Sequence, residues 1–97
     1  VHDNDMPAAK GVVSNLGGTS TLRGITAFNN TTDKGVIHNA SQGSDTEISS
    51  SVIHDNNTIT GGGVYSVPNL GVNNVALNNL TVYNNTSTAQ SKGLYLI

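Results

Sequence analysis

Short apolar runs recur along the chain, separated by polar stretches rich in Asn, Thr, Ser and Gly. Four similar blocks each contain an apolar residue, a ring-bearing residue and two positions of Asp or Asn. They are VHDN, AFNN, IHDN and VYNN, at 1–4, 27–30, 53–56 and 82–85, and their starts lie 26, 26 and 29 residues apart. A repeat of this length indicates stacked similar units rather than one loop of an ordinary domain.

Two further apolar elements accompany the blocks. After each block come a glycine and a short apolar run: GVVSN, GVIHN, GVYSV and GLYLI, starting at 11, 35, 63 and 93. Before three of the blocks stands another apolar element, which contains Leu22, Ile48 or Leu77. No 3.6-residue apolar period is present and β-branched residues are frequent, so helices are not expected. Each repeat therefore predicts three short strands joined by loops.

These strands are too short to form a stable sheet alone, and the period is too short for a four-stranded propeller blade. We expect an all-β fold, a single-stranded right-handed parallel β-helix of about three and a half coils of 26–29 residues. An antiparallel sandwich is the alternative, but the Asn-Gly hairpin signal is absent. Three interior columns are expected: Val1, Ala27, Ile53 and Val82; Leu22, Ile48 and Leu77; and Val12, Val36, Val64 and Leu94.

Asparagine occupies the same position in every block. Asn tolerates left-handed backbone, and its amide can hydrogen-bond the Asn above and below it. We therefore expect a structural Asn ladder at a sharp turn: Asn4, Asn30, Asn56 and Asn85. Glycines would open the following strand where a side chain would clash; they are Gly11, Gly35, Gly63 and Gly93.

Two columns are candidates for surface contacts. If the first interior column points inward, its neighbours point outward as a row of flat rings that would either bind a ligand or partner or stack on one another: His2, Phe28, His54 and Tyr83. A second column is a candidate apolar contact surface: Val13, Ile37, Tyr65 and Tyr95. It neighbours the third interior column, and the sequence does not decide which of the two faces inward.

Composition narrows the classes of function. The 97 residues carry a formal net charge of −2 and only four Lys and Arg, so no basic patch for nucleic acid exists. Cysteine is absent, which excludes disulfides and thiolate metal sites. No apolar run reaches the roughly 20 residues of a membrane-spanning helix.

The stretch IHDNNTITGGGV resembles the repeat of polymorphic outer-membrane proteins and related autotransporter passengers. That repeat pairs an F-x-x-N element with a G-G-A-I element. Ile53 takes the Phe position, Asn56 takes the Asn, and 61–64 takes G-G-A-I, while the other repeats match less fully. The resemblance implies an extracellular or cell-surface location.

Catalytic chemistry is less well supported. Asp3 and Asp55 share a repeat position and could form an acid–base pair. Asn29 stands between them, however, so the column resembles a turn ladder that accepts either Asp or Asn. His2 and His54 are too far apart for one zinc ion. We expect no catalytic residues, no metal site and no cofactor.

The sequence thus predicts a non-enzymatic extracellular or cell-surface scaffold or adhesin segment. A fragment of a polysaccharide-cleaving enzyme and a fibre-forming structural subunit are the alternatives. Residues 1–97 would be one segment, completed by further repeats of a parent chain or by stacked copies of itself, because neither end shows a cap. A surface receptor or a glycan is a further candidate partner; nucleic acid and membrane insertion are not expected.

Overall fold

The computed structural model describes residues 1–6, 8, 11–15, 18–39, 45–67, 74–89 and 93–96, and every named element in it is a strand. Three four-stranded sheets are present, and all pairings are parallel. Sheet I consists, in order, of β1 (Asp5–Met6), β5 (Thr31–Thr32), β8 (Asn57–Thr58) and β11 (Thr86–Ser87).

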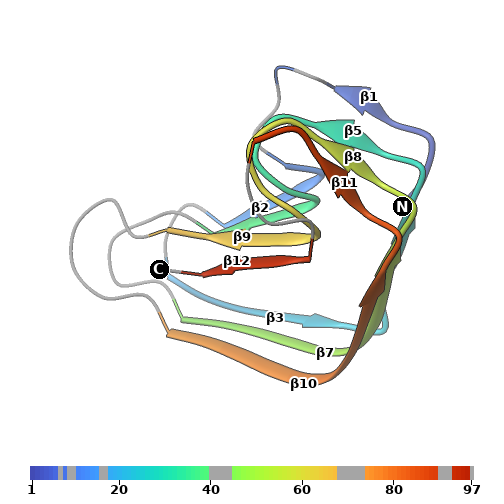
Figure 1. The fold of residues 1–97 in the computed structure, drawn as a ribbon. Coiled ribbons are helices and arrows are strands. Elements are labelled where there is room, and N and C mark those ends of the chain that lie inside the picture. The colour runs from blue at the N-terminus through green and yellow to red at the C-terminus, as the bar shows by residue number, and fades with distance from the viewer. Residues whose placement is uncertain are drawn as a thin grey trace.

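The other two sheets are built in the same way (Figure 1). Sheet II consists of β10 (Asn74–Tyr83), β7 (Asp45–His54) and β3 (Thr19–Arg23), with β4 (Thr26–Phe28) also paired to β7. Sheet III consists, in order, of β12 (Leu94–Leu96), β9 (Val64–Ser66), β6 (Ile37–Asn39) and β2 (Val13–Asn15). Each sheet takes its strands from successive repeats, and we call the strands of one repeat a layer.

The prediction of a single-stranded right-handed β-helix is wrong. The strands form three separate parallel sheets in a compact molecule with principal extents of 30 × 25 × 19 Å. Four strands at the usual spacing cover only about 14 Å from first to last, so the chain does not build an elongated solenoid. The sequence period sets the distance along the chain between paired strands, but it does not determine how the sheets relate to one another. The all-β class was predicted correctly.

Sheet II also differs in its strand lengths. The sequence predicted two separate short elements where β7 and β10 each run for ten residues. A left-handed residue lies inside each, Ser50 with φ 49° and Asn79 with φ 54°, and Gly24 with φ 66° separates β3 from β4 at the equivalent point. In a strand, side chains point alternately inward and outward, and the left-handed residue shifts this alternation by one position. The strand segments before and after it therefore both keep their apolar side chains inward.

The apolar core lies between sheets II and III, and sheet I contributes the buried Thr32 and Thr58. Two predicted interior columns are in register: Leu22, Ile48 and Leu77 pair in turn, as do Ala27, Ile53 and Val82. Ile48 and Ile53 are fully buried. Val1, the first residue of the column that contains Ile53, is 48% exposed.

The register of the third predicted interior column is wrong by one residue in its first half, although Val36 itself is fully buried in the core, as expected. In sheet III, Val13 pairs with Ile37, Ile37 with Val64, and Val64 with Leu94. The four residues of the candidate apolar contact column are not in register for the same reason, because Val13 and Ile37 pair into the column of Val64 and pack against the core, while Tyr65 and Tyr95 pair one position later. Its role as a contact surface stays a prediction. The side chain of Tyr95 lies outside the described residues.

Candidate functional site

The four rings of the candidate ligand column lie in one row, one from each layer. His2 stacks on Phe28 with ring centroids 4.8 Å apart, Phe28 on His54 at 5.3 Å, and His54 on Tyr83 at 4.9 Å. The ring planes differ by 14°, 9° and 2°. The separation matches the spacing of neighbouring strands, because the rings leave equivalent positions in parallel register.

Stacking limits what the row can bind. Both faces of Phe28 and of His54 are covered by neighbouring rings. A sugar ring that stacks on an aromatic face therefore has access only to the outer faces of His2 and Tyr83, at the two ends of the row. Tyr83 is 46% exposed, and the side chain of His2 is exposed at the opposite end.

Two carboxylates flank the row. Nδ1 of His2 lies 2.6 Å from Oδ2 of Asp3, and Nδ1 of His54 lies 2.5 Å from Oδ2 of Asp55. Hydrogen bonding to His2, then to Asn29, lowers the pKa of Asp3 below its ordinary value of 3.8. Hydrogen bonding to His54 likewise lowers the pKa of Asp55, with a smaller contribution from Asn84. Both side chains are therefore ionised at neutral pH.

The same residues form a sharp turn. Asp3, Asn29, Asp55 and Asn84 all have left-handed backbone, with φ of 56°, 54°, 52° and 52°. Sequence reasoning had placed the left-handed residue one position later, on the Asn ladder. The alternation of Asp and Asn is explained by backbone conformation, because these two residue types are among the few that tolerate it.

The Asn ladder runs through all four layers on the inner side of this turn. Nδ2 of Asn4 donates to Oδ1 of Asn30 at 2.8 Å, and the same bond joins Asn30 to Asn56 and Asn56 to Asn85, both at 2.9 Å. In each of these three pairs the backbone N–H of the first Asn donates to the same oxygen of the second. The ladder is thus directional, because in each pair the Asn of the earlier layer donates and the Asn of the following layer accepts.

A shorter ring stack in sheet III was missed. His38 pairs with Tyr65 in register, and their rings stack with centroids 5.6 Å apart. Sequence reasoning aligned Ile37, not His38, with Tyr65 because it matched the glycine of each repeat. Aligning the ring-bearing residues with one another would have found this pair.

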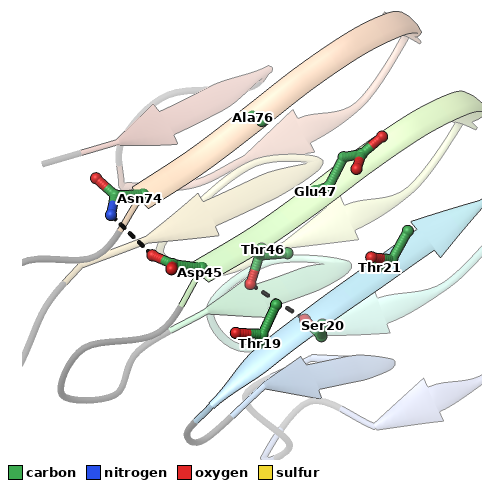
Figure 2. Close-up of a pocket in the computed structure, with 8 residues that line it drawn as sticks. All are labelled: Thr19, Ser20, Thr21, Asp45, Thr46, Glu47, Asn74 and Ala76. Carbon is green, nitrogen blue, oxygen red and sulfur yellow. Dashed lines mark hydrogen bonds between the residues drawn. The ribbon is translucent and has the colours of Figure 1, made fainter.

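A cavity of about 160 Å³ lies along sheet II at the start of its strands (Figure 2). Seven of the eight residues that line it are of polar types. Nδ2 of Asn74 donates to Oδ1 of Asp45 at 2.7 Å, and the hydroxyls of Ser20 and Thr46 are hydrogen-bonded at 3.2 Å. The carboxylates among its lining residues, Asp45 and Glu47, lie two residues apart on β7.

The described residues form neither a metal-binding cluster nor a membrane-spanning helix. No cluster of three or more His, Cys, Asp or Glu side chains there is suited to hold a metal ion. That part of the chain also contains no helix long and apolar enough to cross a membrane.

Comparison with known proteins returned no match: no protein-family model, no curated protein and no solved structure is similar to this chain. The resemblance to the polymorphic outer-membrane repeat therefore rests on the residues at 53–64 alone.

Proposed function

We propose that this chain is a non-enzymatic structural scaffold of a secreted or cell-surface protein. The observation that carries the proposal is the use of its polar and aromatic side chains in ladders between layers. The Asn side chains bind one another, and the rings cover one another. Groups that would otherwise serve a ligand or a reaction are used to hold the repeats in register.

The runner-up is cleavage of a polysaccharide, and the state of Asp3 and Asp55 argues against it. An acid–base pair in a glycosidase needs one carboxylic acid that is still protonated near neutral pH, hence one with a raised pKa. Both pKa values are lowered here, by matching His–Asp hydrogen bonds. Neither group is suited to protonate a leaving oxygen.

Binding of a glycan along the ring row is also disfavoured. An aromatic platform offers ring faces to the sugar, whereas the two inner rings of this row have both faces covered. The location outside the cell is supported by the resemblance of residues 53–64 to the repeat of polymorphic outer-membrane proteins.

Activity on polysaccharides provides the test. The purified chain is incubated with a panel of neutral and acidic polysaccharides, and the release of new reducing ends is measured. We expect no turnover. Turnover that is abolished in Asp55→Asn and unaffected in the matched control Asp5→Asn would overturn the proposal. Asn is already present at the equivalent turn positions 29 and 84, so the first variant should keep the fold.

A further inference from the structure

The two outer layers of the molecule present complementary hydrogen-bonding groups. At the N-terminal end, Oδ1 of Asn4 accepts no hydrogen bond within the described part of the chain, whereas the same atom of each later Asn in the ladder accepts two from the preceding one. At the C-terminal end, Nδ2 of Asn85 donates, among the described residues, only to the carbonyl of Ile53. Its backbone N–H has no acceptor among the described residues, although Asn85 is only 6% exposed.

The ring row and the sheets end in the same way. The outer face of Tyr83 is open at one end of the row, and the outer face of His2 is open at the other. Sheet I ends in β11 on one side and in β1 on the other, and sheet III ends in β12 and β2 (Figure 1). Exposed edge strands present unpaired backbone groups that can pair with another chain. The exposed leucines of β12, Leu94 and Leu96, lie at the same end as Tyr83.

We propose that copies of this chain associate head to tail, with the last layer of one copy pairing with the first layer of the next. Asn85 donates from its amide and its backbone N–H to Oδ1 of Asn4 in the next copy, Tyr83 stacks on its His2, and β11 pairs with its β1. Each bond repeats one that already joins adjacent layers within the chain. This association extends the scaffold role proposed above, on which it rests.

The direction of the ladder determines the type of assembly. An acceptor at one end and a donor at the other make the contact heterologous, so it leaves a free end on each side. Because each junction repeats the spacing of parallel strands in one direction, added copies extend the stack rather than close it into a ring. The junction is incomplete at one place. In the described part of the first layer, only the bridge from His2 belongs to sheet II, so the first half of β10, residues 74–78, finds no partner strand there across the junction.

The first experiment is sedimentation velocity of the 97-residue chain over a range of concentrations. We expect a growing series of open-ended species. A monomer at every concentration would overturn the inference, and so would a dimer that does not grow further. Because no substrate is involved, either result leaves the scaffold proposal standing, and turnover on a polysaccharide would overturn that proposal alone.

The second experiment tests the register by cross-linking, which is clean because the chain contains no cysteine. Asp5 and Thr86 occupy the same column of sheet I and would face each other across the junction. Asp5→Cys is mixed with Thr86→Cys and treated with a short bifunctional maleimide, which spans adjacent strands about 4.8 Å apart. The matched control replaces Thr86→Cys by Thr81→Cys, an exposed position on sheet II. We expect mixed dimers mainly in the first mixture; equal or stronger cross-linking of the control would overturn the register.

The third experiment compares two changes at Asn4. Asn4→Ala and Asn4→Asp both lose the bond that Asn4 donates to Asn30. Only Asn4→Ala also loses the acceptor offered to Asn85 of the preceding copy, and this leaves the donors of that Asn85 unpaired. We expect the association constant to fall about tenfold or more in Asn4→Ala relative to Asn4→Asp. Equal association of the two variants would show that Asn4 is not at the junction.

Discussion

Asn56 occupies the middle of the ladder and is 1% exposed. Its side-chain amide donates to Oδ1 of Asn85 and to the carbonyls of Ala27 and His54, while its Oδ1 accepts from Asn30. One side chain thereby satisfies polar groups in its own layer and in both neighbouring layers. Buried polar groups are costly to leave without partners, so the effect of this residue extends well beyond its own turn.

Asn56→Ala should lower the free energy of unfolding by about 2–4 kcal/mol, because it removes these bonds and leaves buried carbonyls and amides unpaired. Urea denaturation followed by circular dichroism measures the change. The control is Asn78→Ala, an exposed Asn on β10, which should change the free energy by less than about 0.5 kcal/mol. Similar losses in both variants would show that the ladder does not stabilise the fold.

Gly35 shows why glycine precedes a strand of sheet III. A Cβ there would lie 2.9 Å from the carbonyl oxygen of Gly62 and 2.9 Å from Cβ of Tyr65, both in the next layer. Gly93 precedes β12 on the outer layer, where a Cβ would have no atom within 4 Å.

Gly35→Ala should therefore destabilise the chain by about 1–3 kcal/mol, since the layers must separate to admit the methyl group. Gly93→Ala should be neutral or stabilise the monomer slightly, because its backbone is not left-handed and the space is open. Thermal unfolding of dilute samples compares the two. A larger loss for Gly93→Ala than for Gly35→Ala would contradict this explanation.

At the scale of the element, the ring row adds a second ladder outside sheet II. Phe28 lies between two imidazoles and makes two of the three stacking contacts. Its contribution depends on a flat ring at strand spacing as well as on apolar area, because stacked aromatic pairs add to the energy of burial.

Phe28→Leu should cost about 1 kcal/mol or somewhat more, because it keeps apolar area and loses both stacking contacts. Phe28→Tyr keeps the ring and serves as the control, with an expected change near zero. Denaturant midpoints report stability, and the NMR shifts of the His2 and His54 ring protons report the stack directly. Unchanged shifts in Phe28→Leu would mean that the rings do not stack in solution.

Elements also show what the sequence could and could not predict. The ring row and the Asn ladder follow from the sequence because no insertion separates the apolar residue, the ring and the Asn within a block, so one alignment places all three. Sheet III lies beyond a loop of variable length: seven positions lead from Asn30 to Ile37, but eight from Asn56 to Val64. Matching the glycines therefore shifted the register by one residue. The bend at Ser50 was also missed, because serine carries no strong signal for left-handed backbone.

For the whole molecule, the two His–Asp pairs make the free energy of unfolding depend on pH in the acidic range. The pKa values of Asp3 and Asp55 are lowered in the folded state, so their contribution is fully present above about pH 4. It is lost as the pH falls from the unfolded value of about 3.8 through the lowered folded values. The free energy of unfolding should thus fall with acidification below about pH 4 and change little from this source at neutral pH.

The double variant Asp3→Asn with Asp55→Asn should be less stable than the wild type at neutral pH and should lose less stability below pH 4. Urea midpoints at several pH values between about 2.5 and 7 measure both effects. Asp5→Asn is the matched control; Asp5 is exposed and has no side-chain hydrogen bond among those of the described residues, so its profile should follow the wild type. An unchanged acid dependence in the double variant would assign the effect to other carboxylates.

The parallel pairing of every described strand has a consequence for how the chain folds. Paired residues are separated by at least 24 positions, as for Val13 and Ile37, and by as many as 30, as for Val64 and Leu94. No hairpin among the described strands can form early and guide the rest, so a long loop must close before the first contact is made, which slows folding. A chain emerging from the ribosome therefore cannot form the pair of β1 with β5 until the 26 residues that separate their partners have been synthesised, and the repeat length itself delays the start of folding.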